Sequence, residues 1–300
     1  MCVFTEGVCA SRWTYLQSGE ALLTRIPFTK TSGAGNDFVI IDDRRGILPE
    51  DKAALARVIC SRHFGIGADG LLILEESQRA SFLMIYYNAD GSHGGMCGNG
   101  GRCIARYAFL KGIAPAAMRF EALGKTYRAV VEGATVTLHM NDPHSLMHGE
   151  RLLVNGTMID GTFIDTGAPH FVIPIDNLES ADVQGIGTAV RHHPLFEPEG
   201  TNVNFMTAPQ GNSISIRTYE RGVEEETLAC GTGSVACALV ASLPGNVGDH
   251  VRVRVRSGEE LLVRFRKMNS GFSDVSLCGS AHILFTGCVF YDGTSLTVAQ

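Results

Sequence analysis

Long hydrophobic runs are absent from this sequence, and so is the pattern of a secretion signal. No apolar segment approaches the roughly 18 to 20 residues that a membrane-spanning helix requires. In residues 1–27 no basic segment leads into a continuous apolar one, because polar side chains interrupt every candidate run: Glu6, Arg12, Gln17 and Glu20. These absences argue against a helical membrane protein and predict a cytoplasmic protein without a signal peptide.

The sequence also lacks a strong excess of charge of one sign. Its 31 acidic and 25 basic residues give a net charge of −6, and no run of like charges forms a tail. Binding to nucleic acid or to an anionic membrane surface leaves a basic footprint, so neither partner is expected. The 300 residues, of which 45% are hydrophobic, can bury the cores of two domains. A small molecule is the expected partner.

The nine cysteines include no C-x-x-C pair, and their number is odd. Disulfide scaffolds are typical of short secreted chains, and zinc sites and dithiol redox proteins commonly use C-x-x-C pairs. We therefore expect free thiols and no metal site. A buried cysteine usually packs as a small hydrophobic residue. We interpret seven in this way: Cys2, Cys9, Cys60, Cys103, Cys237, Cys278 and Cys288.

The chain contains a duplication with an offset of about 132 residues. Gly35–Asp42 aligns with Gly167–Asp176, and Cys97–Gly100 aligns with Cys230–Gly233. The two motifs are 62 residues apart in the first half and 63 in the second. Because the motifs share one offset, we expect two similarly folded halves.

Each half repeats one order of local patterns. An alternating or apolar segment comes first, then a glycine-containing turn, the cysteine and a helical stretch. This order predicts an α+β protein with two pseudo-symmetric β-rich lobes, each wrapped on a central helix, and a crossing between lobes near 141–143. The predicted helices are Arg102–Leu110 and Ser234–Leu243, and the predicted strands are Phe82–Tyr87, Thr135–Met140, Ser213–Tyr219 and Val251–Val255.

Cys97 and Cys230 each precede a predicted helix, and this position favours a thiolate. The first N–H groups of a helix are unpaired, and the positive end of its dipole attracts negative charge. An interaction of up to about 2 kcal/mol lowers a pKa by roughly 1.5 units, from about 8.5 to near 7. Desolvation of the thiolate acts in the opposite direction. We therefore predict that both thiols are poised between thiol and thiolate near neutrality, as proton transfer requires.

Two such cysteines on facing lobes can invert a carbon atom. One thiolate removes the α-proton while the other thiol protonates the opposite face, and the reverse reaction exchanges the roles. The helix N-termini can also hold a substrate carboxylate through backbone amides and stabilise the charge of the carbanion. This chemistry requires no cofactor. The residues predicted to supply the amides are Gly98, Asn99, Gly231 and Thr232.

These motifs resemble the diaminopimelate epimerase family over about Phe28 to Gly293. The matching segments are Gly33–Phe38, Asn88–Ser92, Met96–Cys103, Gly167–His170, Glu220–Gly222 and Ala229–Gly233. The resemblance implies interconversion of LL- and meso-diaminopimelate, a bacterial step towards lysine and peptidoglycan, without pyridoxal phosphate or metal. It also implies a two-lobed fold whose last strand returns to the first lobe. A homodimer is a candidate assembly.

The resemblance assigns roles to individual residues. Cys97 and Cys230 become the acid and base, and His170 and Glu220 lie near them and tune their proton affinities. A substrate with two carboxylates and two ammonium groups suits amide donors, an arginine fork and a carboxylate acceptor. The residues that would bind it are Asn36, Asn88, Asn202, Glu220 and Arg221. Without the resemblance, each of these is as readily a turn, surface or loop residue.

Two departures from the family pattern concern specificity. Ala168 stands where the family usually has Asn, and Gly70 where a Gln is often found. We therefore predict looser recognition of the distal end of the substrate, with glutamate as a further substrate. The predicted domains are an N-terminal extension (1–27), a first lobe (28–141 with a strand at about 286–300) and a second lobe (142–285).

Three other functions fit parts of the sequence. A proline or hydroxyproline racemase-like enzyme shares the cysteine pair, but its usual His after Cys-Gly is Asn99 here. A thiol-redox protein would leave the polar residues around both cysteines unexplained, and an amino-acid-binding module would not need the thiols. The glycine pattern Gly65–Gly70 is followed by the strand-like Leu71–Leu74 instead of a helix, which argues against a dinucleotide site.

Overall fold

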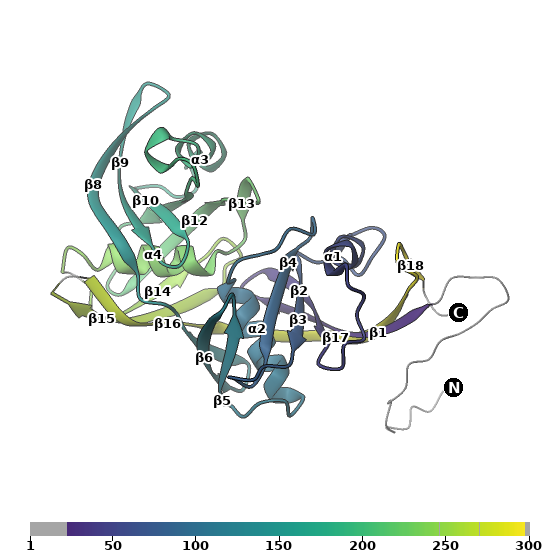
Figure 1. Ribbon diagram of the computed structural model, residues 1–300. Coiled ribbons are helices and arrows are strands. Elements are labelled where there is room, and N and C mark those ends of the chain that lie inside the picture. Colours follow the sequence, from purple (N-terminus) through teal and green to yellow (C-terminus); the bar gives the residue numbers. More distant parts are fainter. Residues whose placement is uncertain (1–22, 246, 270, 298–300) are drawn as a thin grey trace.

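The computed structural model describes residues 23–245, 247–269 and 271–297, which form two β-rich lobes (Figure 1). Strands surround one central helix in each lobe, α2 (Gly98–Leu110) in the first and α4 (Gly231–Ala241) in the second. Most side chains of both helices are buried. The predicted α+β class, with a central helix in each lobe, is confirmed.

The first lobe contains the sheet around α2 and one outer helix, α1 (Lys52–Cys60). Strands β2 and β3 are parallel, β4 and β5 are parallel, and the remaining neighbours are antiparallel. The strands are β1 (Thr24–Gly33), β2 (Asn36–Asp42), β3 (Gly70–Glu75), β4 (Leu83–Asn88), β5 (Ala117–Ala122), β6 (Lys125–Glu132) and β7 (Thr135–His139).

The second lobe surrounds α4 and carries the outer helix α3 (Val183–Arg191) and the short 3-10 helix η1 (Pro194–Phe196). Its strands are β8 (His144–Val154), β9 (Thr157–Asp165), β10 (Pro169–Ile175), β11 (Asn202–Thr207), β12 (Ser213–Glu220), β13 (Glu225–Thr227), β14 (His250–Arg254), β15 (Glu260–Met268) and β16 (Gly271–Ser280). The chain ends with β17 (His282–Tyr291) and β18 (Leu296–Thr297).

The strand pairings repeat between the lobes. In the first lobe, β1 is antiparallel to β2, β2 is parallel to β3, β3 is antiparallel to β4, and β4 is parallel to β5. In the second lobe, β9, β10, β11, β12 and β14 follow the same alternation. The duplicated motifs therefore correspond to duplicated topology.

Two pairings connect the lobes. The last strand of the first repeat, β7, pairs antiparallel with β16 of the second, and β17 then returns to pair with β1 (Figure 1). Strand β1 begins at Thr24, so residues 24–27 of the predicted extension belong to this sheet. The rest of the extension up to residue 22, and the last three residues of the predicted strand 286–300, lie outside the described residues.

Local patterns located the elements well and misplaced two helix starts. All four predicted strands are present, with ends shifted by one residue or less. Helices α2 and α4 begin at Gly98 and Gly231, several residues before the predicted starts. Glycine has a low helix propensity, but close packing at these two positions outweighs it. None of the described helices has the length and apolar composition to span a bilayer.

Candidate active site

Cys97 and Cys230 are the N-cap residues of the two central helices. Both have extended backbone angles, with φ −94° and ψ 118° at Cys97 and φ −117° and ψ 116° at Cys230. The Cys97 sulfur accepts a hydrogen bond from the backbone N–H of Gly100 at 3.4 Å. The Cys230 sulfur lies 3.5 Å from the hydroxyl of Thr232. The predicted position of each thiol at a helix N-terminus is confirmed.

The two helices meet end to end at their N-termini. A Cβ atom placed on Gly231 would lie 3.3 Å from the Cα of Gly98, and one placed on Gly98 would lie 3.6 Å from the Cα of Gly231. Either added atom would also lie 3.1 Å from Leu277 of β16. Because no side chain separates the two first turns, both cysteines open towards the same space. Their unpaired N–H groups converge there as well.

This space is a cleft of about 640 Å³ between the lobes. It is lined by both cysteines and by every other predicted site residue except His170: Asn36, Asn88, Gly98, Asn99, Asn202, Glu220, Arg221, Gly231 and Thr232. Residues more than 100 positions apart in sequence are thus brought to one site. Such a volume suits a small molecule, as the composition predicted.

The prediction that both thiols are poised near neutrality is wrong. Burial raises the pKa of Cys97 to about 11, although the N–H of Gly100 lowers it. Burial raises the pKa of Cys230 further, and the charge of Glu220 raises both. Desolvation of the thiolate therefore outweighs the helix N-terminus. Cys230 is 5% exposed, whereas Cys97 is only partly buried. The more deeply buried thiol therefore has the higher pKa.

Glu220 lies at the end of β12, where it lines the cleft. Burial raises its pKa to about 7, although the Thr227 hydroxyl lowers it by donating a hydrogen bond of 2.8 Å. This carboxyl group therefore changes charge near neutral pH. Because its charge acts on both thiols, the ionisation states of the three groups are linked.

His170 lies on β10 behind the cleft lining, with none of its surface exposed. Its Nδ1 is 3.1 Å from the Asn204 side-chain nitrogen, and its Nε2 has no hydrogen-bond partner. Burial lowers its pKa to about 3, so the imidazole is neutral. A Cβ atom on Gly233 would lie 2.4 Å from the side-chain oxygen of Asn204. His170 therefore reaches the first turn of α4 through Asn204, which the sequence did not single out.

An amide network joins the predicted polar residues of the first lobe. Asn36 follows a two-residue turn in which Ala34 and Gly35 both have positive φ angles, of 57° and 100°. Its side-chain nitrogen donates to Asp69 at 3.0 Å, and its oxygen accepts from Asn99 at 2.6 Å. The turn therefore aims Asn36 at the start of α2.

Hydrogen bonds also hold the polar residues of the second lobe. The Asn202 side chain accepts from the Arg221 backbone N–H at 2.9 Å and donates to the Pro169 carbonyl at 2.9 Å. The Arg221 guanidinium donates to the Glu199 carbonyl at 3.1 Å. Asn202 thus joins β11 to the loop that carries Arg221.

Sequence reasoning missed Tyr86, which lines the cleft from β4. Its ring fills the space beside Gly70 and Gly94, where added Cβ atoms would lie 2.3 and 2.1 Å from ring atoms. The Tyr86 ring therefore occupies the space that a side chain at position 70 would need. Burial raises the pKa of Tyr86, so its hydroxyl keeps its proton. Its place in a strand of apolar pattern offered no signal of a site.

Asp69 and Arg62 are two further cleft residues that the sequence did not indicate. The Arg62 guanidinium pairs with Asp69 at 2.6 Å and with Asp37 at 2.9 Å. Lys30, which is buried, also pairs with Asp37 at 2.7 Å. These ion pairs and hydrogen bonds fix the positions of the acidic side chains in the wall of the cleft. In the described part of the chain, no group of three His, Cys, Asp or Glu side chains could hold a metal ion.

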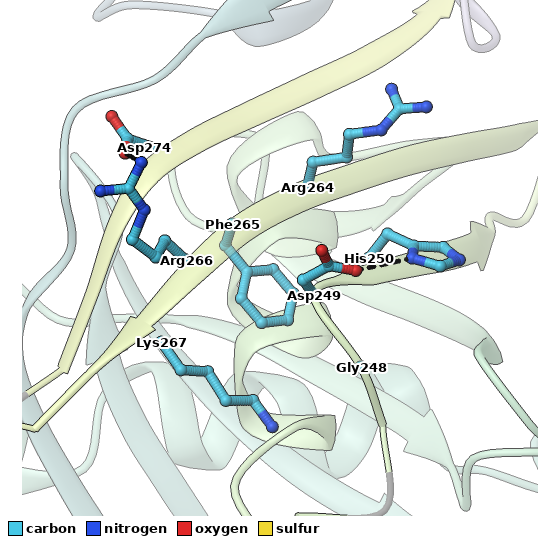
Figure 2. Close-up of a pocket in the computed structure, with 8 residues that line it drawn as sticks. All are labelled: Gly248, Asp249, His250, Arg264, Phe265, Arg266, Lys267 and Asp274. Carbon is cyan, nitrogen blue, oxygen red and sulfur yellow. Dashed lines mark hydrogen bonds and ion pairs between the residues drawn. The ribbon is translucent and has the colours of Figure 1, made fainter.

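A second cavity of about 660 Å³ lies beside β14, β15 and β16 and shares no lining residue with the cleft (Figure 2). Several of its charged groups are paired with other protein groups. Arg266 pairs with Asp274 at 2.9 Å, and Lys267 donates to the carbonyls of Ser242 and Val247 near the end of α4. This cavity offers neither cysteines nor converging backbone amides, so the cleft is the candidate active site.

Comparison with known proteins identifies the family. The diaminopimelate epimerase family model matches residues 28–149 and 162–281. A diaminopimelate epimerase of Chlorobaculum tepidum is 45% identical over 86% of this chain and 99% of its own length, and one of Aquifex aeolicus is 42% identical over 87% and 96%.

Solved structures share the fold at low sequence identity. A phenazine biosynthesis protein of the PhzF family from Bacillus anthracis has a TM-score of 0.71 at 13% identity, covering 89% of this chain and 99% of its own. A hydroxyproline epimerase from Agrobacterium vitis has a TM-score of 0.64 at 15% identity, covering 89% and 93%. The matching family model and the two bacterial diaminopimelate epimerases above show that the chain belongs to the diaminopimelate epimerase family.

Proposed function

We propose that this isomerase interconverts LL- and meso-diaminopimelate, with Cys97 and Cys230 as paired acid and base. The observation that carries the proposal is the meeting of two cysteine-capped helices in one cleft. Each lobe contributes one thiol, so a carbon bound between them is accessible from both faces. The names of the relatives support the substrate. Two thiols on opposite walls suit inversion better than disulfide exchange, because each can act on one face of the carbon.

The reaction transfers two protons. A thiolate at one cysteine takes the α-proton, and the thiol of the other gives its proton to the opposite face of the carbanion. Backbone amides of the first turns of α2 and α4 stabilise the negative charge that spreads onto the carboxylate. The cysteines exchange protonation states in each turnover, and the reverse reaction restores them.

The raised thiol pKa values serve this chemistry once substrate is bound. A pKa of about 11 at Cys97 leaves roughly one thiolate in ten thousand at pH 7, but a thiolate of high pKa is a strong base for a weakly acidic C–H group. The α-ammonium group of the substrate brings a positive charge beside the thiols and favours the thiolate. Substrate binding therefore activates its own base.

Polar groups away from the cysteines bind the rest of the substrate. In this proposal Arg221 pairs with the distal carboxylate, the amides of Asn88 and Asn202 add donors, and ionised Glu220 accepts from an ammonium group. His170 stays neutral and acts on Cys230 only through Asn204. The domains 28–141 with the return strand and 142–285, the homodimer and the activity towards glutamate remain predictions.

Solvent exchange tests the proposal. The full chain is incubated in deuterated buffer with LL- or meso-diaminopimelate and no added cofactor, and α-deuterium is measured by mass spectrometry. We expect exchange and epimerisation in the native chain and loss of epimerisation in both Cys97→Ser and Cys230→Ser. Cys288→Ser, on β17, is the matched control and should keep full activity. Undiminished epimerisation in either cleft variant would rule out the two-cysteine mechanism.

A proline or hydroxyproline racemase-like activity is the second candidate, favoured by the shared fold of the hydroxyproline epimerase. Asn99 follows the first Cys-Gly here, and its amide is bound to Asn36. The same exchange assay with proline and 4-hydroxyproline separates the two activities. We expect no exchange of either imino acid.

A further inference from the structure

Arg102 is fully buried on α2, with none of its surface exposed. Its Nη2 donates to the Asn99 side-chain oxygen at 3.0 Å, and its Nη1 donates to the Gly98 carbonyl at 3.3 Å. Its Nε has no hydrogen-bond partner. Both acceptors are neutral amide oxygens. Burying a cation without a carboxylate partner is costly. The burial of Arg102 therefore indicates a function that outweighs this cost in stability.

Helix stability does not explain this placement. The side chain turns back to the first turn of α2, where the helix dipole repels a cation. The equivalent position in α4, five residues after its cysteine, is Val235, which is buried as well. The repeated fold therefore accepts an apolar residue at this point. In the first lobe, space for the guanidinium exists because Gly279 of β16 has no side chain, and a Cβ atom there would lie 3.2 Å from Nε.

Arg102 fixes the orientation of an amide that bridges the lobes. Asn99 presents its oxygen to Arg102 and its nitrogen to the Asn36 oxygen at 2.6 Å and the Ala229 carbonyl at 3.4 Å. Ala229 directly precedes Cys230, so the Asn99 amide connects the first turn of α2 to the cysteine of the other lobe. A reversed amide would place its nitrogen against the guanidinium. The cation therefore permits only one orientation.

The guanidinium is also a positive charge close to the cleft. The ionisable groups that it attracts, once they carry a negative charge, come from α2, from the loop before β15 and from β16: Cys103, Cys97, Glu259 and Cys278. Of these, Cys97 is the one that lines the cleft. At Cys97 the attraction by Arg102 opposes the repulsion by Glu220 of β12, whereas Val235 gives Cys230 no such cation.

We propose that Arg102 is a positioning residue that locks the Asn99 amide between the lobes and serves as a buried counter-charge for Cys97. Of the two thiols, Cys97 then loses its proton first, and Cys230 stays protonated. The pseudo-symmetric site is therefore electrostatically asymmetric before substrate binds. The consequence for catalysis rests on the two-cysteine function proposed above, but the charge assignment is testable without turnover.

The first test uses the native chain. Alkylation by iodoacetamide is followed from pH 7 to pH 12, a range that includes the Cys97 pKa of about 11, and the modified peptides carrying Cys97 and Cys230 are quantified separately by mass spectrometry. Only the thiolate reacts, so each midpoint reports one thiol. We expect the Cys97 rate to reach its midpoint within this range and the Cys230 rate to keep rising through it, because the pKa of Cys230 is higher. The opposite order, or equal midpoints, would overturn the charge assignment whatever the variants do.

The second test compares Arg102→Met and Arg102→Lys with Arg106→Met. Arg106 is the matched control, because it lies on the same helix and, like Arg102, donates to neutral amide oxygens, here the backbone carbonyls of Gly133 and Ala281 outside the cleft. Arg102→Met should raise the Cys97 midpoint by about one unit, a tenfold slower modification at pH 7. Arg102→Lys should keep the native order of midpoints but lower kcat, because an ammonium group lacks the fork whose two arms reach Asn99 and Gly98. Arg106→Met should change neither.

The outcomes separate this inference from the proposed function. If Arg102→Met folds and its Cys97 midpoint equals the native one, Arg102 is not the counter-charge, even if activity falls. If Arg102→Met does not fold, Arg102→Lys tests the counter-charge instead. The lysine keeps the positive charge, so a Cys97 midpoint above the native one in Arg102→Lys would contradict the proposal. Full epimerisation in Cys97→Ser would refute the two-cysteine function and leave the alkylation order unaffected.

Discussion

Replacing Gly231 with alanine tests how far catalysis depends on the contact between the two helix N-termini. The new methyl group would lie 3.1 Å from the Leu277 methyl, 3.3 Å from the Gly98 Cα and 3.4 Å from the Asn99 oxygen. These distances are shorter than ordinary carbon contacts of about 3.5 to 4.0 Å. Leu277 can change its rotamer, but the Gly98 backbone can yield only if α2 moves. The helices must therefore separate by a few tenths of an ångström.

The expected changes in stability and activity differ in size. Overpacking costs about 1 to 3 kcal/mol, while alanine in a helix is favoured over glycine by up to about 1 kcal/mol. The free energy of unfolding should fall by roughly 0 to 3 kcal/mol, which leaves the protein folded. A misplacement of 1 Å can reduce rate about 100-fold, so a few tenths should reduce kcat by about 3- to 10-fold.

Urea unfolding and steady-state epimerisation kinetics measure both quantities in the same preparations. Gly248→Ala is the control, because its Cβ atom would have one neighbour, the Asn212 side-chain nitrogen at 3.6 Å. The double variant Gly231→Ala with Leu277→Ala removes the contact with Leu277 but not the backbone contact, so it should not recover kcat. Unchanged kcat in Gly231→Ala, or full recovery in the double variant, would refute the backbone explanation.

Two further predictions concern pH and specificity. His170 is held neutral by burial, with a pKa of about 3 against 6.5 in the unfolded chain, so the stability it contributes is complete above pH 6.5 and is lost as pH falls towards 3. The loss is on the order of 5 kcal/mol at pH 3. Urea unfolding at pH 7, 5 and 4 should show that the free energy of unfolding depends less on pH in His170→Gln than in the native chain. An equal pH dependence in the two proteins would contradict this role of His170. Ala168 lines the cleft without a side-chain amide. We expect the native chain to exchange the α-proton of glutamate, and Ala168→Asn to shift the ratio of kcat/KM towards diaminopimelate by about 10- to 100-fold. No glutamate exchange, together with unchanged diaminopimelate kinetics in the variant, would reject looser specificity.

Several features of the fold could be predicted from local patterns. The common offset of the cysteine motifs indicated two similar lobes, because a repeated fold keeps the spacing between equivalent residues. Strands such as β12 and β14 were recognisable by alternation, since one face is buried and the other is not. The cysteines were placed at helix N-termini because a glycine-rich turn precedes an apolar stretch. These features depend on neighbours in sequence.

The ionisation of the site could not be predicted in this way. Desolvation depends on every segment that covers a thiol, and for Cys97 and Cys230 it exceeds the local effect of the helix N-terminus. Likewise, Tyr86 and Arg102 carry no local signal, because one lies in an apolar strand and the other in a buried helix. Their importance arises from contacts with Gly70 and Asn99. The sequence by itself determined which groups are available for proton transfer, whereas the tertiary structure decided their charges, because burial and electrostatic attraction depend on distances in space.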